Sequence, residues 1–282
     1  MKINKYGTLF IIPTPIGNIY DITYRSVQVL QKIDYIAAEN YNKIKKILNK
    51  FNINKPIISF HQHNEIQNTK IIFHKIKKKK NIALVSDAGT PTINDPGFHL
   101  IRECHKKKIK IIPLPGACAA ITALSASGIP SNKFCFEGFL PSKEIQRKKA
   151  LNLLKYEKRT IIFYEAPHRI IHSLQNIIEE FGKKKKIVLA RELTKSWESI
   201  IFDTVENILY KYKNNQSICK GEIVLILSGY KNKKKKIISK KIQYTISVLK
   251  LFLPKNKIAV IISKIYNIKK NYIYKYLIDK IK

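Results

Sequence analysis

GTLFIIPTPIGNIYDIT, residues 7–23, contains the pattern that decides the fold class of this 282-residue chain. The apolar run Leu9–Ile12 has the length of a buried strand, and Pro13 and Pro15 end it. The loop PTPIGN at 13–18 then leads into a helix-like segment. A strand, a loop with Pro and Gly, and a helix in this order are typical of α/β proteins.

The same alternation continues through most of the chain. Further apolar runs of strand length lie at Tyr35–Ala38, Ile82–Val85, Ile109–Pro113, Phe134–Phe139, Thr160–Tyr164, Ile187–Ala190, Ser199–Phe202 and Glu222–Leu227. Helix-like segments lie between them, near 22–33, 42–51, 64–77, 97–107, 116–127, 143–155, 167–180 and 204–212. This alternation favours largely parallel sheets, and these strands are many for one sheet. We therefore predict two α/β domains, residues 1–114 and 115–229.

The last part of the chain, residues 230–282, has a different composition. It begins with the lysine-rich stretch YKNKKKKIISKK and continues as three amphipathic segments, near 241–252, 254–265 and 269–281. Short helices with a polar turn at Asn267 indicate a small all-α, helix-turn-helix-like domain after a basic linker. Because lysines crowd this tail, we expect it to contact nucleic acid. The alternative is a capping bundle whose lysines are only solvated.

The net charge points to the same partner but has a second explanation. The chain has 54 Lys and Arg against 19 Asp and Glu, a formal charge of +35. Such a surface attracts polyanions, with nucleic acid as the first expectation and an anionic membrane as the second. Arginine is rare among these cations, however, and the abundance of Lys, Ile and Asn is also what compositional drift of a genome produces.

Missing patterns disfavour several other classes of protein. The four cysteines form no CxxC pair, so we expect neither a zinc site nor disulfides, and His61 and His63 lack further ligands for a metal. No GxGxxG, P-loop or GxSxG motif is present. The first apolar run is too short for a signal peptide, and Pro and Gly interrupt the uncharged residues 111–132. We therefore expect a soluble, cytoplasmic protein without a metal.

Five loops that follow predicted strands are best suited to bind a ligand. They are PTPIGN (13–18), SDAGTPTINDPG (86–97), PLPGACAA (113–120), YEAPHR (164–169) and ARELTK (190–195). Their glycines permit tight turns and close approach of a ligand to the backbone. In open α/β sheets, ligands bind beyond the carboxyl ends of the strands. We therefore expect these loops to form one deep cleft.

A longer set of segments carries a resemblance to a known family. The segments are GTLFIIPTPIGNIYDIT (7–23), SDAGTPTINDPG (86–97), PLPGACAAITALSASG (113–128), FCFEGFLPSK (134–143), FYEAPHR (163–169), ARELTK (190–195) and KGEIVL (220–225). In this order they resemble the RsmI family of bacterial 16S rRNA (cytidine-2′-O)-methyltransferases. That family belongs to the tetrapyrrole methylase (class III S-adenosylmethionine-dependent methyltransferase) superfamily. The segment LPKNKIAVIISKIYNIKKNYIYKY near the end of the chain also resembles the RNA-binding tail of this family.

The resemblance implies a homodimer that binds S-adenosyl-L-methionine in a cleft between two α/β domains of the tetrapyrrole-methylase type. The implied reaction is methyl transfer to the ribose 2′-hydroxyl of a cytidine in the decoding region of 16S rRNA. The implied cofactor-binding residues are Thr14, Pro15, Asp87, Ala88, Gly89, Thr90, Cys118, Ala119, Ala120, Tyr164, Leu193, Gly221 and Glu222.

The nucleophile in such a reaction is a hydroxyl group, which must lose its proton to a base within hydrogen-bond reach. Glu165, His168 and Glu192 lie in the cleft loops and are the candidates for this catalytic role. Each also has a structural alternative. Either glutamate can pair with a neighbouring arginine, and the histidine can cap its helix.

The scarcity of arginine gives a separate hint. A chain that has replaced most Arg with Lys is expected to keep Arg where its planar, bidentate group is needed. Arg25, Arg169 and Arg191 lie in or beside the cleft loops. We hypothesise that these three residues bind RNA phosphates or stabilise the cleft.

The chain departs from the family pattern after the second predicted strand. Glu39 is followed by Asn40, Tyr41 and Asn42, where the family usually has an acidic residue, Thr and Arg. The contribution of this loop to RNA binding or to the dimer is therefore open.

The sequence leaves two alternatives to this function. One is methylation of a precorrin-like tetrapyrrole, which the loop PTPIGN and the basic tail disfavour. The other is a non-enzymatic RNA-binding protein, which the intact cleft loops disfavour.

Overall fold

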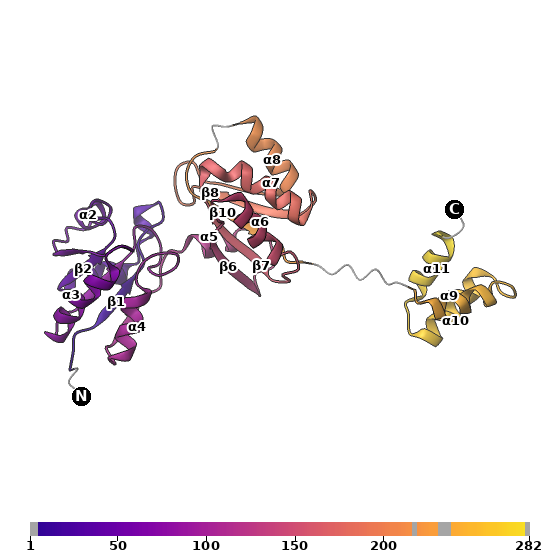
Figure 1. Ribbon diagram of the computed structural model, residues 1–282, viewed down its shortest axis with the longest axis horizontal. Coiled ribbons are helices and arrows are strands. Elements are labelled where there is room, and N and C mark those ends of the chain that lie inside the picture. Colours follow the sequence, from indigo (N-terminus) through magenta and orange to yellow (C-terminus); the bar gives the residue numbers. More distant parts are fainter. Residues whose placement is uncertain (1–4, 216–218, 231–237, 280–282) are drawn as a thin grey trace. The chain divides into compact units, whose positions relative to one another are not determined.

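The computed structural model describes residues 5–215, 219–230 and 238–279 (Figure 1). The chain divides into two compact units, Met1–Tyr230 and Lys231–Lys282, and each is described by itself. In the described part of the first unit, the strands form two five-stranded sheets. Both sheets carry helices, as expected for an α/β protein.

The first sheet is parallel throughout. Its strands are β1 (Leu9–Ile12), β2 (Tyr35–Ala38), β3 (Ile57–Ser59), β4 (Ile82–Val85) and β5 (Ile111–Pro113), in the spatial order β3-β2-β4-β1-β5. All four residues of β4 are buried. A parallel strand covered on both faces needs such a continuous apolar run, which is why the sequence predicts β1, β2 and β4 with their observed bounds.

Helices cover both faces of this sheet. They are α1 (Tyr24–Lys32), α2 (Tyr41–Lys50), α3 (Glu65–Lys77) and α4 (Phe98–Lys106), with the 3-10 turn η1 (Ile19–Asp21) before α1. Helices α1 and α2 share one apolar core with the sheet, and α3 and α4 share a second. Asn40 begins α2, because its side chain accepts the backbone N–H groups of Asn42 and Lys43.

The second sheet is mixed. Its strands are β6 (Phe134–Phe139), β7 (Thr160–Glu165), β8 (Lys186–Arg191), β9 (Ser199–Thr204) and β10 (Ile223–Leu227), in the spatial order β6-β7-β10-β8-β9. Strands β6 and β7 are parallel, whereas β10 is antiparallel to both its neighbours and β9 is antiparallel to β8. The expectation of largely parallel sheets is therefore wrong for this sheet. The link 192–198 between β8 and β9 is too short for a parallel crossover.

The helices of this half are α5 (Ala119–Ser125), α6 (Glu144–Leu153), α7 (Ile170–Phe181) and α8 (Val205–Asn214), with the 3-10 turn η2 (Pro167–Arg169) before α7. Helices α6, α7 and α8 pack in one core with the sheet. Helix α5 packs in another core, which also contains Ile16 from the loop after β1. This core therefore joins the two halves of the first unit.

The second unit consists, in its described part, of three helices. They are α9 (Lys240–Leu249), α10 (Lys255–Tyr266) and α11 (Lys270–Asp279). Their apolar sides meet in a core that includes Ile246, Ile258 and Ile273. Asn267 ends α10 in the left-handed conformation, at the predicted polar turn. Most of the predicted basic linker, residues 231–237, lies outside the described residues. Across the described residues, no helix is long and apolar enough to span a bilayer.

Candidate functional site

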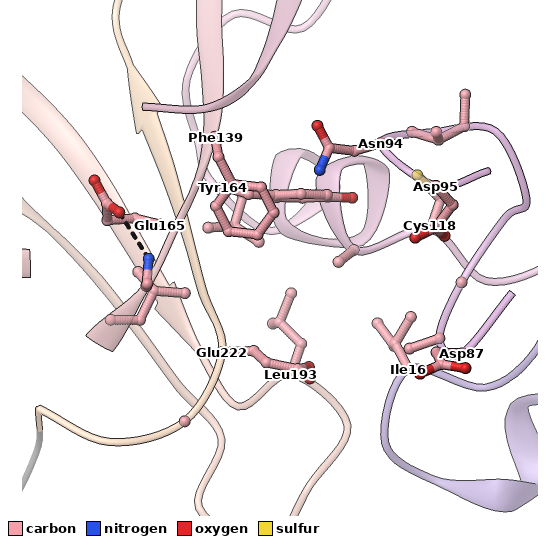
Figure 2. Close-up of a pocket in the computed structure, with 18 of the residues that line it drawn as sticks. Ile16, Asp87, Asn94, Asp95, Cys118, Phe139, Tyr164, Glu165, Leu193 and Glu222 are labelled. Carbon is pink, nitrogen blue, oxygen red and sulfur yellow. Dashed lines mark hydrogen bonds between the residues drawn. The ribbon is translucent and has the colours of Figure 1, made fainter. Parts of the chain in front are cut away.

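A cavity of about 360 Å3 lies where loops of the two sheets meet (Figure 2). Loops after β1 and β4 line it from the first sheet. The start of α5, the loops after β7 and β8 and the residues before β10 line it from the second. The predicted cofactor-binding residues in its lining are Asp87, Ala88, Gly89, Thr90, Cys118, Ala119, Tyr164, Leu193, Gly221 and Glu222.

Thr14 is buried beside the cavity and outside its lining. Its backbone exchanges two hydrogen bonds of 2.9 Å with Gly89, and its hydroxyl donates to the Ser86 carbonyl at 3.0 Å. The hydroxyl of Thr90 donates to the Ala117 carbonyl at 2.9 Å. These bonds connect the loops after β1, β4 and β5, so Thr14 helps to position the loops that do line the cavity.

One wall of the cavity is acidic. Figure 2 shows Asp87 and Asp95 on the side opposite Tyr164. Asp87 forms a 2.9 Å ion pair with Lys43 of α2. Burial, together with repulsion from Glu39 and Asp87, raises the pKa of Asp95 to about 6. This wall is therefore suited to the positively charged part of a ligand.

The opposite wall is aromatic. The hydroxyl of Tyr164 accepts a 3.3 Å hydrogen bond from the Ala120 N–H, and burial raises the pKa of this tyrosine above its usual value. Its ring meets Phe136 and Phe139 edge-on, with ring centres 4.8 and 5.6 Å apart. Ala120 itself lies in the core and, like Pro15, is outside the lining. The wall therefore offers a neutral, apolar surface.

The antiparallel direction of β10 brings Gly221 and Glu222 to the cavity. Ile223, the first residue of β10, pairs with Glu165 at the end of β7 and with Arg191 at the end of β8. The residues before β10 therefore lie at the same edge of the sheet as the loops that follow β7 and β8.

Glu192 lies against Gly221 and outside the cavity lining. Its carboxylate accepts hydrogen bonds from the Lys195 ammonium at 2.8 Å and from the Glu222 N–H at 2.9 Å. Burial alone would raise the pKa of Glu192, but these bonds and the charge of Lys195 lower it. A carboxylate held ionised in this way is better suited to fixing the loop than to accepting a proton.

Glu165 is in the lining but is turned from the cavity. Its buried carboxylate accepts hydrogen bonds from the Ala166 N–H at 2.7 Å, from the Arg169 guanidinium and from the Ser173 hydroxyl. Figure 2 shows this side chain pointing away from the cavity. His168, in η2, is exposed and outside the lining, although Pro167 before it is part of the lining.

The three selected arginines lie in different environments. Arg169 forms the ion pair with Glu165. Arg191 donates to the carbonyls of Trp197 at 3.1 Å and Lys220 at 3.4 Å. Arg25 is exposed on the first turn of α1 and pairs with no acidic group in the described part of the chain.

The lining also contains residues outside the predicted site, among them Asp95, Asn94, Lys43 and Phe139. Asn94 and Asp95 lie in the recognised loop 86–97, and their Asn-Asp-Pro-Gly sequence is a turn signal that marks them as loop residues. Lys43 and Phe139 carry no such signal. Within the described ranges, no group of three or more His, Cys, Asp or Glu is arranged to hold a metal ion.

The comparisons with known proteins agree with this fold. Residues 8–209 match the family described as Tetrapyrrole (Corrin/Porphyrin) Methylases. A diphthine synthase structure superposes with a TM-score of 0.60 at 17% identity, covering 79% of this chain and 90% of that chain. A cobalt-precorrin-4 methyltransferase gives a TM-score of 0.59 at 15% identity, covering 78% and 94%. The fold and the family match together define a methyltransferase of the tetrapyrrole methylase class.

Curated relatives identify the family within this class of methyltransferases to which the chain belongs. The protein named ribosomal RNA small subunit methyltransferase I from Buchnera aphidicola subsp. Baizongia pistaciae is 51% identical, with 99% of this chain and 95% of the relative aligned. The protein of that name from Escherichia coli O157:H7 is 46% identical, with 98% and 96% aligned. The chain belongs to this family of methyltransferases, and its methyl donor is S-adenosylmethionine.

Proposed function

We propose that this chain transfers the methyl group of S-adenosylmethionine to the ribose 2′-hydroxyl of a cytidine in the decoding region of 16S rRNA. The observation that carries the proposal is its similarity, over nearly the whole length, to proteins named for methylation of small-subunit ribosomal RNA. The segments that resemble the RNA methyltransferases in sequence include the loops that line the cavity.

The cavity supports binding of this cofactor through its size and its two kinds of wall. Its volume of about 360 Å3 is within the usual range of small-molecule sites. The acidic wall with Asp87 and Asp95 complements the positive sulfonium and amino groups. The aromatic wall with Tyr164 and Phe139, together with Leu193 and Val224 of the same lining, suits the adenosyl group. When bound, the cofactor supplies an electrophilic methyl group.

The remaining work of the protein is to orient the ribose hydroxyl, exclude water and accept a proton. We assign Glu165 and Glu192 to positioning, because each carboxylate already accepts several hydrogen bonds that hold the cleft loops. We assign to His168 the role of the general base that accepts the proton of the ribose hydroxyl. Its exposed side chain follows Pro167 of the cavity lining and forms no hydrogen bond within the described part of the chain, so it is free to turn toward a bound ribose.

An RNA substrate would give the strong positive charge a function. Phosphate groups bind lysines without regard to sequence, so a lysine-rich helical unit attached to the methyltransferase core adds affinity for rRNA. We propose this role for residues 230–282. Because the proposed substrate is 16S rRNA, free or in the small ribosomal subunit, we also propose a cytoplasmic location.

We also propose that the chain acts as a homodimer. The edge strand β9 exposes Ile200 and Phe202, and Trp197 before it is 77% exposed. Native proteins usually cover such an apolar edge. A second copy paired through the same patch would cover it with two-fold symmetry. Sedimentation velocity tests this proposal: the Phe202→Glu variant should be monomeric, and a monomeric wild-type protein would contradict it.

Substrate choice tests the proposed function. The protein is incubated with labelled S-adenosylmethionine and either unmethylated small ribosomal subunits or a precorrin-type tetrapyrrole. We expect the label in the rRNA. Label found in the tetrapyrrole alone, or in neither substrate, would contradict the proposal.

A further inference from the structure

Helix α2 is labelled on the first sheet's domain in Figure 1. It carries a row of exposed lysines. Lys43, Lys46 and Lys50 are spaced i, i+3 and i+7, so they share one side of the helix. Ile44 and Leu48 are buried against the first sheet. Residues 41–50 contain no acidic side chain. The helix therefore adds no negative charge of its own along the roughly 10 Å that the row spans.

Both ends of this row are connected to loops of the cavity. Lys43 pairs with Asp87 of the cavity wall, yet its side chain is still 57% exposed. The ammonium of Lys50 lies 5.0 Å from the centre of the Tyr20 ring. Tyr20 is in η1, which follows the loop that contributes Ile16 to the cavity. The row therefore runs from the cavity wall to η1.

Two exposed aromatic rings and an exposed arginine lie in η1 and on the first turn of α1. Tyr20 is 69% exposed and Tyr24, at the start of α1, is 79% exposed. Arg25 follows Tyr24 and is exposed as well. Large rings left in solvent beside cations are typical of surfaces that bind single-stranded nucleic acid, because unpaired bases stack on the rings while the cations hold phosphates.

We propose that the surface formed by Tyr20, Tyr24, Arg25, Lys43, Lys46 and Lys50 holds the single-stranded RNA that flanks the methylated nucleotide. The lysines and the arginine bind phosphates, and the tyrosines stack on unpaired bases. The connection to Asp87 places the start of this RNA path at the cavity. The inference rests on the proposed function, since it needs an RNA substrate.

Tyrosine variants test the stacking. Affinity for a fluorescent single-stranded oligocytidylate is measured by anisotropy. The double variant Tyr20→Ala, Tyr24→Ala should bind roughly tenfold or more weakly, whereas Tyr20→Phe, Tyr24→Phe should bind as the wild type does, because phenylalanine keeps the ring. Tyr210→Ala is the matched control, since this side chain is 72% exposed on α8. Unchanged affinity in the double Ala variant, or equal losses in the control, would overturn the inference.

Lysine variants test the phosphate contacts. The double variant Lys46→Gln, Lys50→Gln is compared with Lys70→Gln, Lys77→Gln, which removes the same charge from α3 in the other core of the sheet. Losing two phosphate contacts to a single strand should reduce the slope of log affinity against log salt by about 1.4. The α3 variant should keep the wild-type slope. Equal slopes in both variants would overturn the inference.

Methylation of small ribosomal subunits separates this inference from the function on which it rests. A wild-type protein that transfers no methyl group to subunits contradicts the proposed function. An active wild-type protein whose double Ala variant keeps the same KM for subunits contradicts the RNA path alone. Binding of anionic lipid vesicles in place of oligocytidylate, with loss in the same variants, would assign the surface to a membrane and also overturn the inference.

Discussion

The backbone N–H of Asn18 donates a 3.0 Å hydrogen bond to the side-chain oxygen of Thr194 and so joins the loop after β1 to the loop after β8. The neighbouring Gly17 fits closely against the same loop. A Cβ atom at Gly17 would lie 2.6 Å from the Thr194 hydroxyl and 2.9 Å from the Leu193 carbonyl. Leu193 lines the cavity, so this contact between the two halves of the first unit fixes one end of the cavity, the proposed cofactor site.

Removing the hydroxyl of Thr194 should therefore weaken cofactor binding. We expect Thr194→Val to raise the Kd for S-adenosylmethionine roughly fivefold, the equivalent of one hydrogen bond of about 1 kcal/mol. Thr194→Ser keeps the hydroxyl and should bind as the wild type does. Isothermal titration calorimetry measures both. A valine variant with wild-type affinity would show that the contact does not support the site.

Gly221 should not tolerate a side chain. It has a φ of +86°, and a Cβ atom there would collide with the carboxyl group of Glu192. Gly182 has nearly the same φ, +85°, but open space around its Cα. Gly221→Ala should therefore lower the Tm and the cofactor affinity more than Gly182→Ala does. Equal losses in thermal unfolding would mean that backbone strain, rather than the collision, sets the cost.

The pH dependence of cofactor binding should reflect Asp95. Its pKa is raised to about 6 by burial and by repulsion from Glu39 and Asp87, so the carboxyl is protonated below that pH. A cationic ligand needs the ionised form, and its affinity should fall as pH is lowered through 6. Titration calorimetry between pH 5 and pH 8 tests this. Asp95→Asn should bind the cofactor more weakly and lose this pH dependence. If the variant keeps the pH dependence, another group must be responsible for it.

The same pKa predicts the opposite trend for the stability of the cofactor-free protein. The folded state holds the Asp95 proton more tightly than the unfolded chain does. The contribution of Asp95 to the free energy of unfolding should therefore decrease as pH rises from about 4 to about 6. Urea unfolding of the wild type and of Asp95→Asn across this range isolates the contribution. A difference between the two that grows in the wild type's favour with rising pH would contradict the assignment.

His168→Gln should reduce the rate of methyl transfer without changing cofactor affinity. Loss of a general base typically costs about a hundredfold or more in kcat. Single-turnover methylation of small subunits measures the rate, and calorimetry measures the affinity. A variant that transfers methyl groups at the wild-type rate would show that His168 is not the general base.

Glu165→Gln should act through stability. The substitution leaves the Arg169 guanidinium without its buried carboxylate and alters the acceptor of the Ser173 hydroxyl. Removing one partner of such a pair costs about 3 kcal/mol or more. Urea unfolding should show this loss. A variant of unchanged stability but greatly reduced kcat would instead identify Glu165 as the base.

Much of this organisation could be predicted from the sequence, because buried parallel strands leave an unmistakable local pattern. The apolar runs at Leu9–Ile12, Tyr35–Ala38 and Ile82–Val85 coincide with the observed strands. Strand β3 could not be predicted this way, since its three residues are only partly buried or exposed. The direction of β10 depends on pairing with strands far away in the sequence, which no local pattern records.

The residues of the candidate site likewise include some that local sequence predicts and some that it does not. Loop glycines and prolines mark positions such as Gly89 and Gly221, because tight turns restrict the residue type. Lys43 enters the lining through its ion pair with Asp87, a tertiary contact that neither residue's neighbours reveal. The sequence left open whether Glu165 and Glu192 are bases or pair with neighbouring groups. Only their hydrogen-bond partners in the structure distinguish between these roles.

Identifying the atom that receives the methyl group tests the proposed function most directly. Small ribosomal subunits that lack this modification are incubated with the protein and labelled S-adenosylmethionine, and their 16S rRNA is digested to nucleosides for mass spectrometry. We expect the label in 2′-O-methylcytidine from the decoding region. Label on a base, or no label in rRNA when the cofactor is bound, would contradict the proposed function.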